Sequence, residues 1–294
     1  MDEAARLARA HYRQQQALAR NVVRALALLW DALDTVDLLV AWGAVAQRAA
    51  ELVAVGQYAA ANNAISYVRA AVEAQNADAE PIAPVDPRAL SGVAADGGPL
   101  SGLLIGGVFR VRALLAAGVP LAEAMASGKA RLILAASNEV VQAGISASTA
   151  VIGVTPSVTG YTRVLTPPSC SRCIILAGRH YPHSAGFLRH PGCDCQHVPD
   201  AGGLSGAVVS PEATFDAMST AEQDATFTKA GAEAIRNGAD IGRVVNARMS
   251  THVPTGRRTA RGTPTRRTVE DLLAIAGSDR DRFAALLDSA GYIR

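Results

Sequence analysis

Aromatic side chains are scarce in this sequence, at 4% of 294 residues. A core made mainly of stacked rings is therefore excluded, and the abundance of Ala, Val and Leu favours many closely packed helices. Charged residues are also few, at 18%, and the net charge is only +2. This balance is too near neutral to predict a nucleic-acid-binding protein from composition alone.

The sequence also lacks a long apolar run free of charges. Its most apolar stretch, residues 25–46, is interrupted by Asp31, Asp34 and Asp37. Three carboxylates there argue against a membrane span. The first residues are charged and polar where a secretory signal would be apolar, so we expect synthesis in a reducing cytoplasm.

Apolar positions recur at intervals of three and four in the first 75 residues, which predicts amphipathic helices. The capping residues at 35–37 and the glycine at position 56 are typical of helix ends. We therefore expect three helices, over residues 18–36, 38–52 and 58–72, joined as antiparallel hairpins. Their apolar faces form either the core of a bundle or a surface for a partner.

The helical pattern stops at residues 76–99, where prolines and glycines predict a linker. Helices resume over residues 103–115 and 121–150, and Gly128 and Gly144 favour two helices within the second range. The segments TGYTRVLTPP and CDCQHVP predict two short strands. Ser210 and Pro211 are typical of the start of another helix.

These patterns predict a mostly α (α+β) fold in four parts. They are an N-terminal helical region, a linker, a middle module with strands and cysteines, and C-terminal helices that contain a basic linker. Their respective ranges are 1–75, 76–99, 100–200 and 201–294, with the basic linker at 248–268.

All four cysteines lie between Cys170 and Cys195, together with three of the six histidines. They form a C-x2-C pair, a spacer of 19 residues and a C-x-C pair. Paired cysteines at about this separation are typical of a structural zinc site. We therefore predict a site for structural zinc formed by Cys170, Cys173, His190, Cys193 and Cys195.

Two other interpretations of the cysteines stay open. Reduced, buried thiols pack as small apolar side chains, and a thiol beside a histidine can act as a nucleophile. The catalytic interpretation is the weaker one, because a nucleophilic thiol seldom needs three other cysteines beside it. Neither HExxH nor GxSxG, motifs of other hydrolases, occurs in the sequence. The nearest triad-like combination, Ser184 with His180 or His183 and Asp194, has no spacing typical of a protease.

The basic linker carries six arginines among Thr, Ser, Gly and Pro. It is either a solvated connection or a segment that contacts DNA phosphates or an acidic protein surface. No aromatic residue lies between the arginines, so any DNA contact would be independent of base sequence. The candidate nucleic-acid-binding residues are Arg257, Arg258, Arg261, Arg266 and Arg267.

The stretch SCSRCIILAGRHYPHSAGFLRHPGCDCQHVP, residues 169–199, resembles the signature of the phage Mu F-like head morphogenesis family in its actinobacterial-phage version. The positions that carry the resemblance are Cys170, Cys173, Leu176, Ala177, Gly178, Tyr181, His190, Pro191, Cys193 and Cys195. Many members have an acidic residue where this chain has Ala177. The resemblance covers about residues 99–248.

The resemblance implies a minor capsid protein that docks on the portal protein or the major capsid protein and aids assembly or DNA delivery. Its expected place is the virion, at the capsid interior or portal vertex, after a stage in the host cytoplasm during assembly. Packaged DNA would be a non-specific partner, and no membrane is expected. Similar proteins are often labelled capsid maturation proteases, so a hydrolase acting on head proteins is the alternative.

Overall fold

The computed structural model describes residues 3–185, 195–202, 210–249, 268–277 and 279–293. The chain forms two compact units. Unit 1 comprises Met1–Thr166 and His180–Ala207, and unit 2 comprises Pro167–Arg179 and Val208–Arg294. The predicted mostly α fold with a small strand module is confirmed. The boundaries of the four predicted parts stay a prediction.

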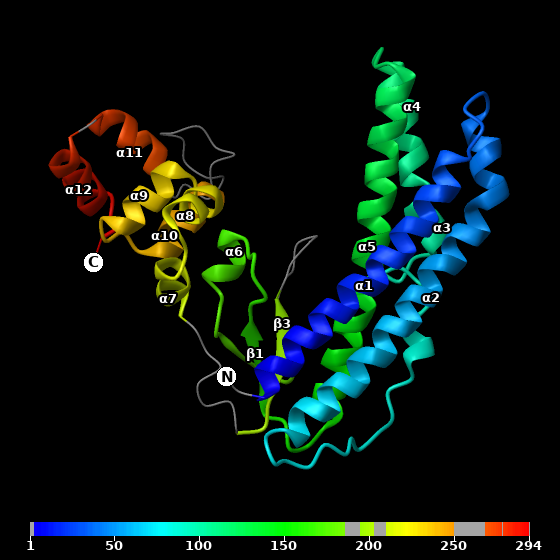
Figure 1. Cartoon of the computed structure of the whole chain (residues 1–294), viewed down its shortest axis with the longest axis horizontal. Coiled ribbons are helices and arrows are strands. Elements are labelled where there is room, and N and C mark those ends of the chain that lie inside the picture. The colour runs from blue at the N-terminus through cyan, green and yellow to red at the C-terminus, as the bar shows by residue number, and fades with distance from the viewer. Residues whose placement is uncertain (1–2, 186–194, 203–209, 250–267, 278, 294) are drawn as a thin grey trace, which may run out of the picture. The chain divides into compact units, whose positions relative to one another are not determined.

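Unit 1 is built on helices. They are α1 (Glu3–Asp31), α2 (Leu38–Glu73), α3 (Leu100–Leu104), α4 (Gly106–Ala116) and α5 (Leu121–Val154), with a short 3-10 turn, η1 (Pro87–Leu90). Of these, α1, α2 and α5 are long and lie side by side (Figure 1). The predicted break at residues 35–37 is confirmed. Asp37 begins α2 by accepting a hydrogen bond from the Val40 amide, which satisfies one of the helix's first N–H groups.

The predicted helix end at Gly56 is wrong, because α2 continues through it. A Cβ atom at this position would lie 2.5 Å from the Val22 side chain and 2.9 Å from that of Val140. Gly56 therefore lets α2 approach α1 and α5 closely, and tertiary packing outweighs its low helix propensity.

The predicted division of residues 121–150 into two helices is also wrong, because α5 is continuous. A Cβ atom at Gly128 would lie 2.4 Å from the Val111 side chain, and one at Gly144 would lie 2.6 Å from the Gln15 amide. Both glycines are places where a neighbouring helix packs against the α5 backbone, and neither ends the helix.

The core of unit 1 contains residues from both sides of the predicted linker. The Trp30 and Trp42 rings, with centroids 6.1 Å apart, pack in one buried cluster with side chains of α4 and α5. The linker is tied to the helices by polar contacts. The Gln57 amide donates to the Val93 carbonyl at 2.7 Å, and the Glu139 carboxylate accepts from the Ala95 N–H at 2.8 Å.

Helix α2 is the one described helix that is long and apolar enough to cross a membrane by length and composition alone. Its most apolar window has a mean hydropathy of 1.5. Its buried positions, among them Trp42, Val53 and Val68, belong to the helical core.

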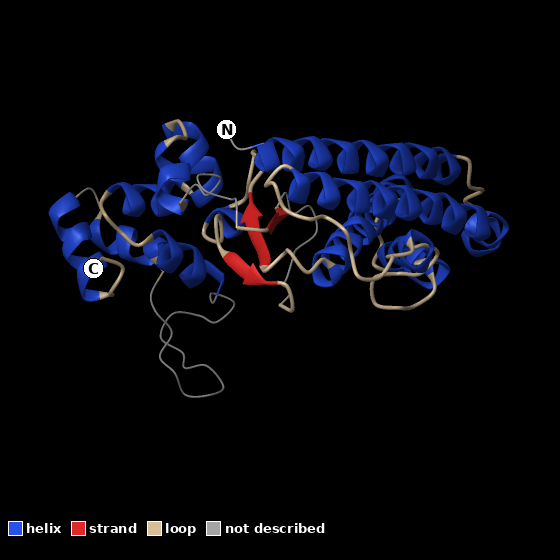
Figure 2. Cartoon of the chain, turned by 90° about the horizontal axis from the view of Figure 1, so that it is seen from below, coloured by secondary structure: helices blue, strands red, loops and turns tan. Residues whose placement is uncertain are grey.

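A small antiparallel sheet lies at one end of these helices (Figure 2). Its strands are β1 (Gly160–Val164), β2 (His180–Pro182) and β3 (Gln196–Asp200), in the order β2-β1-β3. The two predicted strands are confirmed as β1 and β3, while β2 was not anticipated. Tyr161 and Val198 are fully buried and share a cluster with Ala4, Ala8 and Val68 of the helices.

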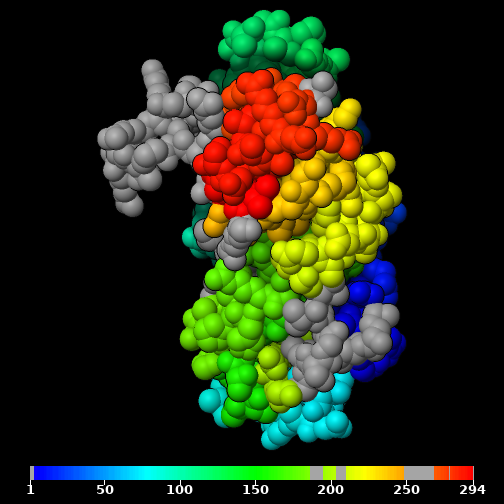
Figure 3. Space-filling model, turned by 90° about the vertical axis from the view of Figure 1, so that its left-hand side faces the viewer, coloured from blue at the N-terminus to red at the C-terminus, as the bar shows by residue number. Residues whose placement is uncertain are grey.

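Unit 2 consists of short helices. They are α6 (Ser171–Ile174), α7 (Pro211–Asp216), α8 (Thr220–Phe227), α9 (Lys229–Arg236), α10 (Ile241–Met249), α11 (Val269–Ala276) and α12 (Arg280–Ser289). Ser210 caps α7 by accepting from the Ala213 amide, as predicted. Val244, Phe283 and Leu287 contribute to a common core, and Figure 3 shows α11 and α12 in orange and red against the yellow helices.

Candidate functional site

The predicted zinc ligands are only partly within the described residues. Cys170 is exposed and precedes the first residue of α6, where Cys173 lies one turn further and is buried. Both belong to unit 2, whereas Cys195 is buried in unit 1 directly before β3. His190 and Cys193 lie outside the described residues. Among the residues that are described, no group of three or more His, Cys, Asp or Glu side chains is arranged to hold a metal ion.

Cys195 accepts a hydrogen bond from a buried arginine. The Nε–H group of Arg163 on β1 donates to the Cys195 sulfur at 3.0 Å, and the arginine is only 2% exposed. A cation beside a thiol stabilises negative charge on the sulfur, and the thiolate is the form that binds metals. The contact therefore suits a metal-ligating or reactive sulfur.

Arg163 was not predicted as a site residue, although the sequence contains a signal for it. A single charged residue stands in the otherwise uncharged strand GYTRV, all of whose residues are buried. Burial of an arginine costs free energy unless its N–H groups find acceptors. An arginine in a buried strand therefore points to a polar partner nearby.

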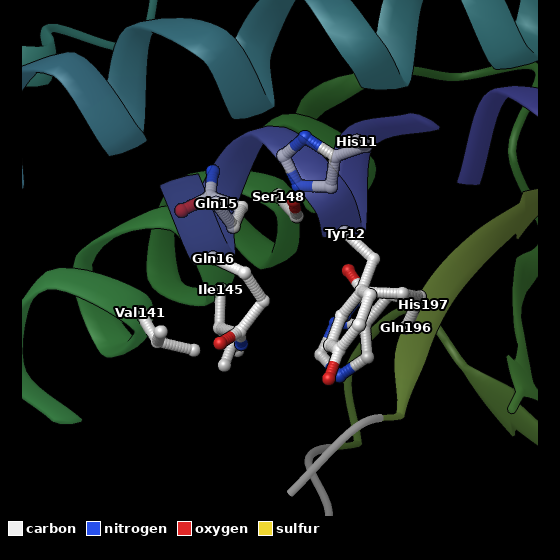
Figure 4. Close-up of a pocket in the computed structure, with 9 residues that line it drawn as sticks. All are labelled: His11, Tyr12, Gln15, Gln16, Val141, Ile145, Ser148, Gln196 and His197. Carbon is white, nitrogen blue, oxygen red and sulfur yellow. The ribbon is translucent and has the colours of Figure 1, made fainter. Parts of the chain in front are cut away.

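A small cavity lies in unit 1 where α1, α5 and β3 meet (Figure 4). Its volume is about 10 Å³, and its lining includes His11, Gln15, Ser148, Gln196 and His197. His11, Gln15 and Ser148 were not predicted from the sequence, because each lies within an ordinary helix pattern.

His11, which lines this cavity, is a buried histidine with a neutral side chain. Its Nδ1 atom lies 2.7 Å from the Asn63 side-chain oxygen on α2. Burial lowers the pKa of His11 from 6.5 to about 4, although the Asn63 contact opposes the shift. A neutral imidazole at neutral pH serves here as a packing and hydrogen-bonding group.

Strand β3 is anchored to α2 by tyrosine and glutamine side chains. The Tyr67 hydroxyl donates to the His197 carbonyl oxygen at 2.7 Å, and the Gln75 amide donates to the Pro199 carbonyl at 2.8 Å. The His197 ring stacks on Tyr161 with centroids 4.4 Å apart. These contacts fix the sheet against the helices and so position Cys195.

The triad-like residues lie only partly within the described residues. The acidic partner of His180 is Asp200, whose carboxylate lies 3.3 Å from the imidazole Nδ1. A Cβ atom at Gly160 would lie 2.7 Å from the His180 ring, so the ring passes over this glycine. Asp194 lies outside the described residues.

The candidate nucleic-acid-binding residues, Arg257, Arg258, Arg261, Arg266 and Arg267, also lie outside the described residues. Their role in DNA binding therefore stays a prediction.

Comparison with known proteins gives the family. The family model described as VG15 protein matches residues 1–221, three quarters of the chain. The chain belongs to the VG15 family. This membership makes it a phage-associated protein. No curated protein and no solved structure matches the chain.

The VG15 match includes all residues assigned to unit 1 and ends within α8. The Arg163–Cys195 contact and the cavity of unit 1 both lie in the VG15 region. The helices α9 to α12 and the basic linker follow it.

Proposed function

We propose that this VG15-family chain is a structural minor capsid protein that aids head morphogenesis in a tailed phage. It docks on the portal protein or the major capsid protein, at the capsid interior or portal vertex. Family membership, which makes the protein phage-associated, is the observation that carries the proposal. The resemblance of residues 169–199 to the Mu F-like signature supports the head role.

An apolar surface on unit 1, with side chains from before and after the linker, supports docking. At the turn between α1 and α2, Val36 is 92% exposed and Val40 is 69% exposed. Leu115 and Leu121 are exposed at the α4–α5 turn, which lies at the same end of the helices (Figure 1). Exposed apolar side chains gathered in one place are typical of protein-interaction sites.

The zinc site belongs to this proposal as a structural element. Cys170, Cys173, Cys193 and Cys195 supply the thiolates that zinc prefers, and His190 supplies an imidazole. The hydrogen bond from Arg163 to Cys195 fits a thiolate ligand, because outer-shell donors commonly orient such groups.

Particle incorporation tests the docking role. Val36→Ser and Val40→Ser together would remove apolar contacts while leaving the buried Trp30–Trp42 contact in place. We expect this variant to fold but to be depleted from assembled heads, as measured by quantitative mass spectrometry. Ile82→Ser is the matched control, because Ile82 is 79% exposed and lies outside both turns.

Normal incorporation of the folded double variant would exclude the α1–α2 turn as the docking surface. Proteolysis of purified major capsid protein by the wild-type chain would support the hydrolase alternative and contradict a purely structural role.

A further inference from the structure

Four exposed arginines form a row along α1. They recur at intervals of seven, seven and four residues, and they are Arg6, Arg13, Arg20 and Arg24. At 3.6 residues per turn these intervals place the four side chains within an arc of about 40° on one helical face, over about 27 Å of its length. Buried positions such as Gln15 and Val22 lie on the opposite face. The arginine row is therefore directed away from the core of unit 1.

The middle of the arginine row carries positive charge that the described structure leaves unpaired. α1 contains no Asp or Glu between Glu3 and Asp31. Glu3 pairs with Arg6 at the start of the row, and Asp31 pairs with a lysine of α5. Within the part of the chain that the structure describes, Arg13 and Arg20 have no ion-pair partner. Their guanidinium groups are available to an anionic partner.

Guanidinium groups at these intervals suit carboxylates of another protein. The planar group donates two parallel hydrogen bonds to one carboxylate, and its weak hydration makes it easier to bury at an interface. Arg20 and Arg24 are about 6 Å apart along the axis, and Arg13 and Arg20 are about 10.5 Å apart. Carboxylates one and two turns apart on a partner helix have the same spacing.

The surroundings of the row favour a protein partner over DNA phosphates. Leu28 follows Arg24 by one turn and is 73% exposed. The α1–α2 turn, with the exposed Val36 and Val40, comes directly after the end of α1. Arginine beside exposed apolar side chains is typical of protein interfaces. A polyphosphate would gain nothing from the apolar groups, and the carboxylates at both ends of the row would repel it.

We propose that the arginine row and Leu28 extend the docking surface of unit 1 and bind a carboxylate-bearing surface of the head protein on which the chain docks. This inference rests on the docking role proposed above and adds the chemistry of the partner surface. Apolar groups of the partner meet the α1–α2 turn, and its carboxylates meet the row. Exposed ion pairs each contribute little affinity, so the row chiefly raises the association rate and sets the orientation of docking.

Biolayer interferometry of the full chain against purified portal protein and purified major capsid protein, over a salt series, tests the proposal. Arg13→Glu with Arg20→Glu should weaken binding by about tenfold or more, because two attractions become repulsions. It should also remove most of the decrease in affinity that salt causes in the wild type. The control is Arg280→Glu with Arg282→Glu, the same charge change at exposed positions of α12, which should bind as the wild type does.

Circular dichroism checks that the variants fold. If the charge-reversal variant does not fold, Arg13→Gln with Arg20→Gln takes its place, because it introduces no new charge. Loss of two exposed ion pairs should then weaken binding by about 2- to 30-fold.

Unchanged binding of a folded row variant to the head proteins would overturn the proposal. If Val36→Ser with Val40→Ser lost binding in the same assay, the docking role itself would stand. A wild type that binds neither head protein would contradict the proposed function, and this inference with it. If the row variant instead lost affinity only for duplex DNA in a parallel assay, the row would be a phosphate contact and the proposal would be wrong.

Discussion

His11 of α1 stacks on Tyr67 of α2 with ring centroids 4.3 Å apart and planes only 6° from parallel. Both rings are buried, and burial also raises the pKa of Tyr67. Tyr67 in turn donates its hydroxyl hydrogen to β3. This pair therefore connects the two long helices to the strand that follows Cys195.

The neutral state of His11 predicts that acid destabilises unit 1. The folded-state pKa of about 4 lies below the ordinary 6.5, so between these values the unfolded chain binds a proton that the folded chain does not. The free energy of unfolding is therefore highest above pH 6.5 and falls as the pH drops towards 4. His11 contributes about 3 kcal/mol to this fall.

Denaturant unfolding at pH 7 and pH 4 measures this effect. His11→Gln should reduce the loss of stability between the two pH values, whereas the control His183→Gln, at an exposed site, should leave it unchanged. Equal losses in the wild type and His11→Gln would show that His11 does not control the acid response.

The glycines of α2 offer a second prediction. Gly56→Ala should destabilise the chain by about 1–3 kcal/mol, because its Cβ atom would collide with Val22 and Val140. Gly43→Ala, on the same helix, meets no atom within 4 Å and should stabilise it by up to about 1 kcal/mol. Thermal unfolding compares the two variants. Destabilisation of equal size would contradict the close-approach role of Gly56.

These glycines also show which features of the fold can be predicted from sequence patterns and which cannot. The break at residues 35–37 was predictable because Asp37 provides a local cap. Gly56 and Gly144 were misread as interruptions because their function depends on Val140 and Gln15, which lie far away in sequence. Local propensity contains no information about such contacts.

The candidate site shows the same contrast between local sequence signals and contacts made by residues far apart in the sequence. The cysteine spacing drew attention to Cys195, whereas its partner Arg163 comes from a strand 32 residues earlier. His11 and Ser148 lie on amphipathic helices where single polar residues are common. Only the antiparallel packing of α1 on α5 places them together.

The Arg163–Cys195 contact leads to a third prediction. Cys195→Ala should cost about 1–3 kcal/mol, because it leaves a buried guanidinium group without its sulfur acceptor. Arg163→Met combined with Cys195→Ala should recover part of this loss, since the apolar side chain needs no acceptor. Cys170→Ala, at an exposed cysteine, is the control. Chemical unfolding with reductant and chelator isolates the contact from any metal effect, and additive losses in the double variant would argue against coupling.

Zinc content is the subject of a fourth prediction. Elemental analysis of reduced protein should find about one zinc per chain, and a chelator should lower the melting temperature. Cys193→Ser should remove the metal, and His183→Gln, outside the proposed ligand set, should retain it. A metal-free wild type with unchanged stability in chelator would favour the interpretation as reduced, buried cysteines.

The basic linker gives a fifth prediction, that the full chain binds duplex DNA weakly and without base preference. Affinity should fall steeply with salt, because arginines that neutralise phosphates release counterions, with a slope of about 0.9 per contact on logarithmic axes. Replacing the arginines at 257, 258, 261, 266 and 267 by alanine should abolish binding and leave the circular dichroism spectrum unchanged.

The control is Arg280→Ala with Arg282→Ala, at exposed positions of α12. It removes positive charge elsewhere in unit 2 and should have little effect on DNA binding. Fluorescence anisotropy over a salt series compares the variants. If the linker variant binds as well as the wild type and the α12 variant does not, the DNA contact lies on α12.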